Sequence, residues 1–460
     1  MDFIRLHAGM TDPMTTFFIS TLGCKVNQFE SEAMEHSLRQ SGHIPANPGD
    51  TADVCIINTC AVTQKAAMQS RQAIRKAIRF HPSARILVTG CYAQVGPDEI
   101  KTIKGIHAVI GKTEKGDLKR FVPEISADND LALLSRDEDI ISFKSAMGMK
   151  SVPLGTRSRP FLKIQDGCNA FCTYCIVPHA RGPSRSLAPE AVLNQLKEIW
   201  NAGYPEVVLT GIHLGGYGAD LNPPLDLVEL LRRVQTSGWT GRIRLSSIEP
   251  REISDALIRL ASASNGSRAE ICPHFHIPLQ SGDDEILKRM GRPYTRTFFK
   301  DRVLKIKERI PHASVGVDVL VGFPGETEAA FENTFSLISE LPVSYCHIFP
   351  FSRRKNTPAF GFKDQVPQPV IKDRCRRLQG LGHSKRRAFY EKAVGEEAEV
   401  VVEEKSFREK NLFKGVTSNY IPVLIEGKKD PGCKTVRVRI TGISEKGKTV
   451  IVTAKTKEEE

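Results

Sequence analysis

Three cysteines within eight residues constrain this chain more than any other feature. Cys168, Cys172 and Cys175, called here the central triad, have the spacing C-x3-C-x2-C. They follow a short apolar run at residues 161–164, which predicts a buried strand. We therefore expect the three thiols to lie on the loop that leaves the carboxyl end of this strand, where a metal can be bound.

The spacing limits which metal the central triad can hold. Structural zinc sites usually combine two C-x2-C pairs or a Cys/His quartet, and no second pair is present, although His179 offers a fourth ligand. A ferredoxin-type cluster takes four cysteines, the first three spaced C-x2-C-x2-C. Core cysteines gathered by chance are disfavoured, because Gly167 and Pro178 predict a turn. Three thiolates on a [4Fe–4S] cube would leave one iron open for a chelating small molecule.

The N-terminal part predicts a parallel, doubly wound sheet, because β-rich and helical runs alternate from residue 16 to about 120. Each predicted strand leads into a cysteine, namely Cys24, Cys60 and Cys91, called here the N-terminal triad. Ligands bind at the carboxyl ends of such strands, so we expect these thiols to converge on a second metal site. Cys55 lies inside its strand and reads as a small buried residue. The predicted strand and helix pairs are 17–21 with 28–40, 54–58 with 64–80, and 86–89 with 97–104.

The charge distribution favours a polyanionic partner such as nucleic acid. The chain has 65 Lys and Arg against 53 Asp and Glu, and residues 353–392 carry twelve basic and three acidic residues. The helix predicted over 64–80 has no acidic residue and fits either a phosphate-contacting surface or an ordinary exposed helix. Its basic residues are Lys65, Arg71, Arg75, Lys76 and Arg79.

The two triads and their flanking residues resemble the methylthiotransferases, radical S-adenosylmethionine enzymes with an N-terminal cluster domain. The resemblance covers about residues 15–455. It implies two [4Fe–4S] clusters and S-adenosylmethionine, the central triad holding the cluster that binds S-adenosylmethionine and the N-terminal triad the cluster that binds or supplies the inserted sulfur. The motifs are Leu22-Gly-Cys-Lys-Val-Asn27, Asn58-Thr-Cys60, Thr89-Gly-Cys-Tyr-Ala-Gln94 and Gly167-Cys-Asn-Ala-Phe-Cys-Thr-Tyr-Cys-Ile-Val-Pro178.

The central part predicts a parallel, barrel-like sheet, open if only six strands are present. The strand candidates are 161–164, 206–209, 242–245, 274–277, 316–321 and 345–349, with helical runs such as 189–201 and 327–340 between them. Glycine-rich or polar loops follow several of these strands, and the resemblance implies that they surround the cofactor. The implied cofactor-binding residues are Tyr174, Arg181, Gly211, Gly215, Gly216, Gln280, Ser281, Asp318 and Gly322. Alternatives are a helix cap for Ser281, and buried, hydrogen-bonded roles for His213 and Asp318, which we expect to point from strand ends.

The C-terminal part predicts a small β-barrel, from short alternating runs at 399–402, 416–421, 436–440 and 449–453. It resembles the TRAM domain that methylthiotransferases use to grip their substrate. The predicted domains are a cluster domain at 15–120, a linker at 121–158, a radical S-adenosylmethionine partial (β/α)6 barrel with a basic C-terminal helix at 159–394, and the TRAM-like barrel at 395–456. Phosphate contacts from this barrel would need one face, formed by Lys414, Lys434, Arg437 and Arg439.

The resemblance implies a tRNA methylthiotransferase that converts N6-threonylcarbamoyladenosine at position 37 to its 2-methylthio derivative. Cys-Lys-Val-Asn27 is similar to that branch, whereas the isopentenyladenosine branch reads Cys-Gln-Met-Asn and the ribosomal-protein branch Cys-Pro-Lys-Asn. Those two substrates remain alternatives, as does a non-catalytic iron–sulfur protein that binds RNA.

The implied partners are a tRNA anticodon stem-loop, an electron donor of the flavodoxin or ferredoxin type and a sulfur donor. Eleven clustered cysteines and the absence of a long apolar run predict a cytoplasmic protein without a membrane anchor, and we expect a monomer. Residues 1–13 carry no pattern, which makes Met14 a candidate start.

Overall fold

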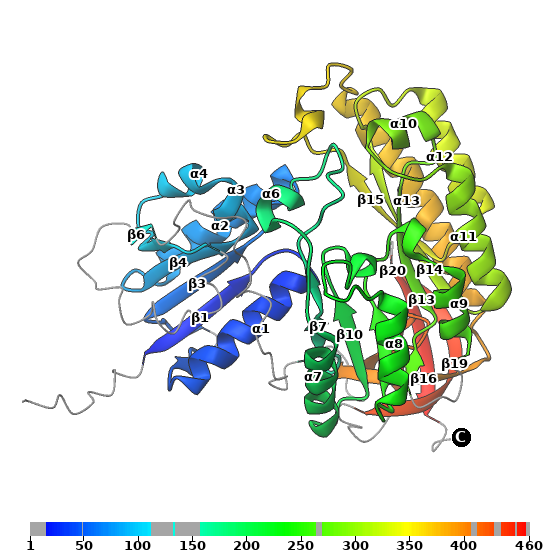
Figure 1. Ribbon diagram of the computed structural model, residues 1–460, viewed down its shortest axis with the longest axis horizontal. Helices are drawn as coiled ribbons and strands as arrows, with labels where there is room; N and C mark the ends of the chain where they lie inside the picture. The colour runs from blue at the N-terminus through cyan, green and yellow to red at the C-terminus, as the bar shows by residue number, and fades with distance from the viewer. Residues whose placement is uncertain are drawn as a thin grey trace, which may run out of the picture. The chain divides into compact units, whose positions relative to one another are not determined.

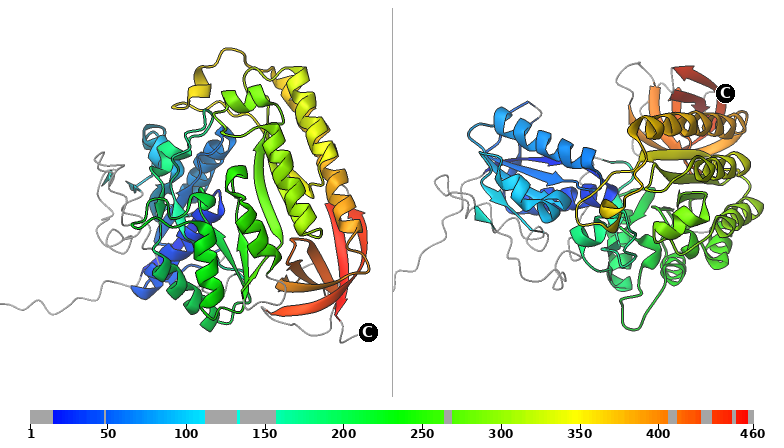
Figure 2. Two further views of the ribbon diagram at one scale, coloured as in Figure 1. Left: turned by 45° about the vertical axis from the view of Figure 1, so that its right-hand side comes forward. Right: turned by 90° about the horizontal axis from the view of Figure 1, so that it is seen from above.

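The computed structural model describes residues 15–47, 49–111, 132–133, 157–263, 269–405, 412–426, 434–446 and 449–456. The chain divides into two compact units, residues 1–151 and 152–460, and each is described by itself (Figures 1 and 2). None of the helices in the described ranges is long and apolar enough to span a membrane. Apart from residues 132–133 and 157–158, the predicted linker at 121–158 lies outside these ranges.

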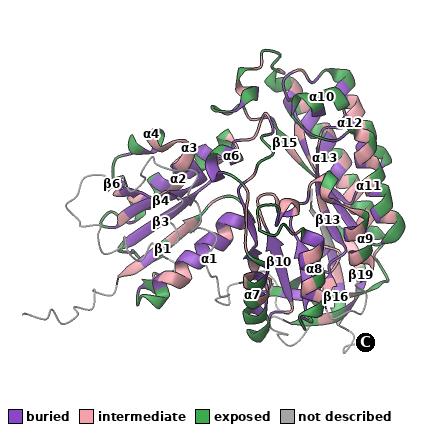
Figure 3. Ribbon diagram, viewed as in Figure 1, coloured by how far each residue is buried: buried purple, intermediate pink, exposed green. Residues whose placement is uncertain are grey.

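The first unit is built on one parallel sheet with the order β2-β1-β3-β4-β5-β6. All six residues of the central strand β3 are buried, as expected of a β-branched run covered on both faces (Figure 3). The prediction of a doubly wound sheet is confirmed. The two-residue strands were not predicted, and the first helix begins earlier than expected. The strands are β1 (Thr16–Thr21), β2 (Ile44–Pro45), β3 (Val54–Thr59), β4 (Arg85–Gly90), β5 (Ala108–Val109) and β6 (Ala132–Leu133), and the helices are α1 (Lys25–Gln40), α2 (Gln64–Phe80), α3 (Cys91–Val95) and α4 (Pro97–Lys101).

The second unit begins with the predicted parallel strands, which form two sheets rather than one continuous sheet. Their orders are β12-β11-β10-β7 and β13-β14-β15, so β7 and β15 are the open edges of a partial barrel. A small antiparallel pair, β8 with β9, holds the segment around the central triad. The strands are β7 (Phe161–Lys163), β8 (Gln165–Asp166), β9 (Arg185–Ser186), β10 (Glu206–Thr210), β11 (Arg242–Leu245), β12 (Glu270–Ile271), β13 (His274–Gln280), β14 (Ser314–Val321) and β15 (Tyr345–Pro350).

Helices between these strands begin at ordinary capping residues. Thr295 and Thr327 each accept a hydrogen bond from a backbone N–H in the first turn of α11 and α12, and Asp283 does so for α10. The cap of α10 is therefore Asp283 and not Ser281. The helices are α6 (Val177–Arg181), α7 (Pro189–Asn201), α8 (Leu227–Thr236), α9 (Asp255–Ser262), α10 (Asp284–Arg289), α11 (Arg296–Arg309), α12 (Glu328–Glu340) and α13 (Gln368–Glu391).

The C-terminal strands close into the predicted small barrel, with the order β16-β17-β18-β20-β19. The run expected as one strand at 416–421 is instead the end of β17, a turn and the approach to β18, because Tyr420 adopts a left-handed conformation with φ 70°. Tyr390, near the end of α13, packs into the core of this barrel. The strands are β16 (Glu397–Lys405), β17 (Leu412–Thr417), β18 (Pro422–Glu426), β19 (Thr435–Lys446) and β20 (Thr449–Thr456).

A buried ion pair attaches this closed barrel to the amino-terminal ends of the partial-barrel strands. Arg244 on β11 donates to both carboxylate oxygens of Glu206 on β10, over 2.7 and 3.1 Å, and neither side chain is more than 1% exposed. The same guanidinium donates to the carbonyl oxygens of Thr417 and Ser418 in the β17–β18 turn. Tyr420 in that turn stacks on His274 of β13, with ring centroids 4.2 Å apart.

Candidate metal centres and cofactor site

The N-terminal triad lies on three loops that meet at the carboxyl edge of the first sheet. Cys24 precedes α1, Cys60 follows β3 and Cys91 begins α3. A Cβ at Gly23, where φ is +104°, would lie 2.9 Å from Cys60 Sγ. A Cβ at Gly90, where φ is +96°, would lie 2.4 Å from the Thr59 carbonyl oxygen. The glycine before each outer cysteine therefore lets its loop approach the Cys60 loop.

Buried hydrogen bonds fix these three loops to one another. Asn27 Nδ2 donates to the carbonyl oxygens of Leu22 and Thr59, over 2.7 and 3.0 Å. Asn58 Nδ2 donates to the Asn27 carbonyl oxygen, and the Thr59 hydroxyl donates to the Thr89 carbonyl oxygen. The polar residues inside the cysteine motifs thus hold the cysteine loops in place, a role that the spacing of the cysteines alone did not reveal.

The donor set of the N-terminal triad fits an iron–sulfur cluster. Cys60 and Cys91 are 6% exposed and Cys24 is exposed, so the site is reachable from solvent on one side only. Cys24 and Cys91 stand at the amino-terminal ends of α1 and α3. Cys55 is fully buried in β3 and burial raises its pKa to about 12, which confirms its reading as an apolar core residue.

The central triad lies on the loop between β8 and α6, as the sequence predicts. Phe171 in this loop has a φ of +46° and is 63% exposed, a strained geometry of the kind found at functional sites. The backbone N–H of Ala170 points at Cys168 Sγ over 3.4 Å. Burial raises the pKa of the Cys175 thiol to about 12, although a backbone N–H of Val177 opposes this. Iron would displace the proton of such a thiol, because the thiolate is the ligand.

A cavity of about 440 Å³ adjoins this loop. Cys172 and Cys175 line it together with Phe171, His179 and residues 356–358 of the segment that follows β15. Soft thiol ligands, N–H donors to sulfur and an adjoining void together fit a [4Fe–4S] cluster. His179 lies at the edge of the same cavity, in an exposed position.

Arg292 is a partner of the central triad that sequence reasoning missed. Its Nη1 donates to Cys172 Sγ over 3.3 Å, and its Nη2 pairs with the Glu249 carboxylate. Its Nε donates to the Tyr294 hydroxyl over 3.1 Å. The arginine is 8% exposed, so water screens the electrostatic interaction between its charge and the cysteine only weakly.

His213, in the glycine loop after β10, is the second such partner. Its Nδ1 lies 3.7 Å from Cys168 Sγ and its Nε2 lies 2.5 Å from Glu252 Oε1. These contacts raise the pKa of His213 to about 10. A Cβ at Gly215 would lie 1.9 Å from Glu252 Oε2, so this glycine is needed to admit the carboxylate that orients His213.

The other predicted cofactor residues surround the same region of the second unit. A Cβ at Gly211 would lie 2.8 Å from Gln165 Oε1, whereas a Cβ at Gly216 would meet nothing closer than 3.5 Å. Tyr174 packs edge to face on Phe323, with ring centroids 6.5 Å apart. Gln280 has a φ of +65° at a bulge that ends β13, which is a second strained residue in this unit.

Three of the predicted cofactor residues have clear structural roles. Gly322 has a φ of +80°, and a Cβ there would lie 2.3 Å from Ile371 of α13. The Ser281 hydroxyl is 1% exposed and accepts from the Asp283 N–H. Arg181 is also 1% exposed and donates to Asp166 over 2.9 Å. Contact of these residues with a cofactor stays a prediction.

Asp318 is not at a strand end but in the middle of β14, between two histidines on the neighbouring strands. Its Oδ1 lies 2.9 Å from His276 Nε2 on β13 and 3.2 Å from His347 Nδ1 on β15. Burial alone would raise the pKa of Asp318, but the two imidazoles lower it to about 2. A carboxylate only accepts, so both of these ring nitrogens donate to Asp318, and the Ser247 hydroxyl is hydrogen-bonded to His276 Nδ1 over 2.7 Å.

Most of the arginines on α13, which belong to the basic stretch 353–392, are paired within the protein. Arg374 binds Glu326 and Glu328, and Arg377 binds Glu328 and Glu332. On α2, which the sequence left open as a phosphate-contacting surface or an ordinary exposed helix, Arg71 pairs with Glu99 of α4. On the C-terminal barrel, Arg437 and Arg439 pair with Glu399 and Glu397 of the adjacent strand.

Two protein-family models and several known proteins match the sequence of this chain. The model described as "Uncharacterized protein family UPF0004" matches residues 16–111, and the model described as "Radical SAM superfamily" matches residues 162–338. The chain is 40% identical to "Threonylcarbamoyladenosine tRNA methylthiotransferase MtaB" of Bacillus subtilis, over 93% of this chain and 94% of the relative. It is 35% identical to "tRNA-2-methylthio-N(6)-dimethylallyladenosine synthase" of Clostridium botulinum, over 92% and 94%.

A solved structure shares the fold at low sequence identity. The radical S-adenosylmethionine methyltransferase TsrM of Kitasatospora setae, solved with cobalamin and a [4Fe–4S] cluster, superposes with a TM-score of 0.53. The two chains are 13% identical, and the match covers 75% of this chain and 76% of that one.

Proposed function

Because the chain belongs to the radical S-adenosylmethionine methylthiotransferase family, we propose that it adds a methylthio group to N6-threonylcarbamoyladenosine at position 37 of tRNA. Three relatives named for the threonylcarbamoyl substrate are 37 to 40% identical over most of the chain, against 35% for relatives named for the dimethylallyl substrate. The observation that carries the reaction type is the presence of two cysteine triads. The N-terminal triad lies on three loops at the carboxyl edge of a parallel sheet, and the central triad lies on the loop between β8 and α6, shortly after the parallel strand β7.

The enzyme uses [4Fe–4S] clusters and S-adenosylmethionine. The central triad would hold the cluster that binds S-adenosylmethionine, and the N-terminal triad the cluster that binds or supplies the inserted sulfur. When bound, the reduced central cluster and S-adenosylmethionine supply a 5′-deoxyadenosyl radical, which reacts at a C–H bond that resists polar attack.

The side chains around the central triad supply charged and oriented hydrogen-bonding groups next to the cysteines. Arg292 places a positive charge next to Cys172 Sγ, and the Glu249 carboxylate neutralises the charge of this arginine. Glu252 orients His213 toward Cys168. The glycine loop and Gln280 would contact the cofactor, since a Cβ at Gly216 would meet nothing closer than His213, at 3.5 Å, and Gln280 holds a strained backbone at the end of β13.

The proposed reaction also determines which partner molecules the enzyme requires. Each turnover consumes an electron for reductive cleavage of S-adenosylmethionine, a sulfur atom and a methyl group. It therefore requires an electron donor, of flavodoxin or ferredoxin type, a sulfur donor, and a second molecule of S-adenosylmethionine as the methyl donor. The RNA partner is a tRNA anticodon stem-loop, consistent with a net charge of +12. We propose that the enzyme acts as a monomer in the cytoplasm.

The experiment is nucleoside mass spectrometry of tRNA from cells with and without the gene. We expect 2-methylthio-N6-threonylcarbamoyladenosine to disappear on deletion while N6-threonylcarbamoyladenosine accumulates. Loss of the 2-methylthio form of isopentenyladenosine instead would assign the chain to the other tRNA substrate. Unchanged tRNA nucleosides with a demodified ribosomal protein would contradict the tRNA proposal.

A further inference from the structure

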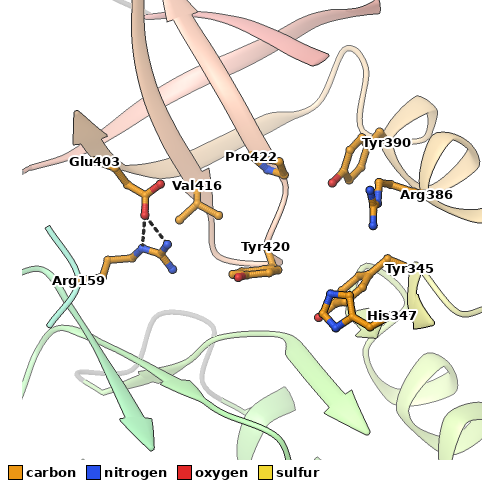
Figure 4. Close-up of a pocket in the computed structure, with 9 residues that line it drawn as sticks. All are labelled: Arg159, Tyr345, His347, Arg386, Tyr390, Glu403, Val416, Tyr420 and Pro422. Carbon is orange, nitrogen blue, oxygen red and sulfur yellow. Dashed lines mark hydrogen bonds and ion pairs between the residues drawn. The ribbon is translucent and has the colours of Figure 1, made fainter. Parts of the chain in front are cut away.

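A pocket of about 280 Å³ lies where three parts of the second unit meet. Arg386 and Tyr390 come from the end of α13, Tyr345 and His347 from β15, and Tyr420 from the β17–β18 turn (Figure 4). Because β15 is an open edge of the partial barrel, the pocket adjoins the side on which that barrel is not closed by a strand. It is called here the α13 pocket.

Arg386 is the unusual residue of the α13 pocket. It is half-buried, yet it forms no hydrogen bond or ion pair with any other residue in the described part of the chain. Its neighbours on α13 differ in this respect, since Arg376 pairs with Asp373 and Arg387 pairs with Glu391. A guanidinium that loses part of its hydration without gaining a carboxylate is ready to bind an anion.

The acidic residue of the α13 pocket does not supply that anion. The Glu403 carboxylate accepts from Arg159, whose Nε lies 3.0 Å from Oε1. Figure 4 shows this pair on the side of the pocket away from Arg386, which lies beside Tyr390 and above Tyr345 and His347. In the α13 pocket, the charge of Arg159 is therefore neutralised by Glu403, whereas the charge of Arg386 is not neutralised by a carboxylate.

His347 supplies a second polar group beside Arg386. Its Nδ1–H is donated to Asp318, which fixes the ring and leaves Nε2 without a partner among the described residues. The ring is fixed on its other side by T-shaped packing on His276, with centroids 5.2 Å apart. With its side chain 48% exposed, His347 can accept a hydrogen bond from a ligand hydroxyl or N–H at Nε2.

Aromatic side chains give the α13 pocket rigid walls. Tyr345 is held by a hydrogen bond from or to His274 Nε2 over 2.8 Å, and its ring lies 6.3 Å from that of Tyr420. Tyr420 keeps a left-handed backbone, with φ 70°, which directs its ring toward the partial barrel. A cationic donor, an imidazole and preset aromatic walls are suited to a small oxyanion that is attached to an organic group or a nucleotide.

We propose that the α13 pocket binds an oxyanion of the RNA substrate, with Arg386 as the charged donor, while His347 Nε2 accepts a hydrogen bond from a neighbouring hydroxyl or N–H of that substrate. This inference rests on the proposed function and makes it more specific. Two parts of that substrate carry such a group, the carboxylate of the threonylcarbamoyl side chain and a phosphate of the anticodon backbone. If the carboxylate is bound, Arg386 selects the threonylcarbamoyl substrate over isopentenyladenosine, which has no anion on its side chain.

The test measures binding of two anticodon stem-loops to the reconstituted full-length protein, by fluorescence anisotropy under anaerobic conditions. One RNA carries N6-threonylcarbamoyladenosine at position 37 and the other carries adenosine. The variants are Arg386→Gln and Arg386→Lys, and the matched control is Arg376→Gln, which removes an exposed charge from the same helix.

We expect Arg386→Gln to weaken binding about tenfold, as for loss of one charge-assisted hydrogen bond, while Arg376→Gln has a smaller effect. A loss confined to the modified RNA assigns the carboxylate. An equal loss for both RNAs, with a salt dependence reduced by about one phosphate contact and partial rescue by Arg386→Lys, assigns the phosphate. Binding of both RNAs by Arg386→Gln as by the wild type overturns the inference.

Product formation separates this inference from the proposed function. A methylthiolated product from the wild-type enzyme supports the proposed function even if Arg386→Gln binds normally. A wild-type protein that neither binds nor modifies either RNA contradicts both.

Discussion

Arg292 Nη1 donates a hydrogen bond to Cys172 Sγ over 3.3 Å, although the two residues are 120 positions apart in the chain. The same guanidinium is bound by Glu249 and Tyr294, so its orientation does not depend on the cysteine. We propose that Cys172 is a ligand of the central cluster, and Arg292 would then be a fixed outer partner of that ligand.

Replacement of Arg292 by glutamine should weaken the central cluster without preventing its formation. Outer partners of metal ligands typically contribute 10- to 100-fold in affinity, so we expect iron to be lost at least about tenfold faster when a chelator is added. The measurement is the decay of the cluster absorbance in a protein in which the N-terminal triad is changed to alanine. Arg289→Gln is the control, because Arg289 pairs with Asp364 on the surface. Equal decay in all three proteins would contradict this role.

Iron content should report two independent centres, because the triads lie in different units. We expect about eight irons in the reconstituted protein, and about four after Cys168, Cys172 and Cys175 are changed to alanine. The second protein should no longer cleave S-adenosylmethionine. Stoichiometric zinc without iron in the wild-type protein would be incompatible with this assignment.

The N-terminal triad should be needed for sulfur insertion and not for cleavage of the cofactor. With Cys24, Cys60 and Cys91 changed to alanine, we expect 5′-deoxyadenosine to form while methylthiolated RNA falls below detection. Cys55→Ala is the matched control, since this fully buried cysteine in the same unit should be dispensable for both activities. Full methylthiolation by the triple variant would show that the sulfur role lies elsewhere.

The ion pair between Glu206 and Arg244 should stabilise the joint between the two barrels of the second unit. Replacing Arg244 with methionine removes the bidentate partner of the buried Glu206 carboxylate and leaves Arg159 Nη1, 3.4 Å away, to balance it. This should cost about 3 kcal/mol in the free energy of unfolding. The measurement is urea unfolding at neutral pH, with Arg232→Met as the control at an exposed position. A loss below about 1 kcal/mol would contradict the assignment.

The same pair predicts a dependence of stability on pH. Burial alone would raise the pKa of Glu206, but Arg244 lowers it below the ordinary value. A depressed pKa means that the contribution is present above the pKa of the unfolded chain, near 4.5, and is lost as the pH falls below it. We therefore expect the wild-type protein to lose its advantage over Arg244→Met in acid. A constant difference between neutral and acid pH would refute this linkage.

Local patterns in the sequence were enough to predict most of the fold. Helix α7 and strand β11 have the predicted bounds, because each is a single periodic run between turn residues. The two-residue strands β2, β5, β6, β8, β9 and β12 were missed, since so short a segment has no period. The end of β17 and the approach to β18 were merged into one strand, because the left-handed Tyr420 gives no glycine signal.

The residues of the candidate site could be predicted where their spacing in the sequence forms a motif. They could not be predicted where their role depends on contacts between distant parts of the chain. The cysteines stand out by their intervals, and the glycines before Cys24 and Cys91 belong to the same motifs. Arg292 and Arg386 look like any other arginine in the sequence. Only the fold shows that the first contacts a cysteine and that the second lacks the partners that its neighbours on α13 have.

The central claim is that this chain methylthiolates threonylcarbamoyl-modified tRNA, and one competition experiment tests it most directly. The reconstituted wild-type enzyme is incubated with S-adenosylmethionine, a reductant, a sulfide source and an equal mixture of two anticodon stem-loops. One RNA carries N6-threonylcarbamoyladenosine and the other N6-isopentenyladenosine, and the nucleosides are quantified by mass spectrometry. We predict that the 2-methylthio product forms on the threonylcarbamoyl RNA in at least about tenfold excess, the selectivity that one charge-assisted contact can supply. Product formed only on the isopentenyl RNA, or on neither RNA, would contradict the account.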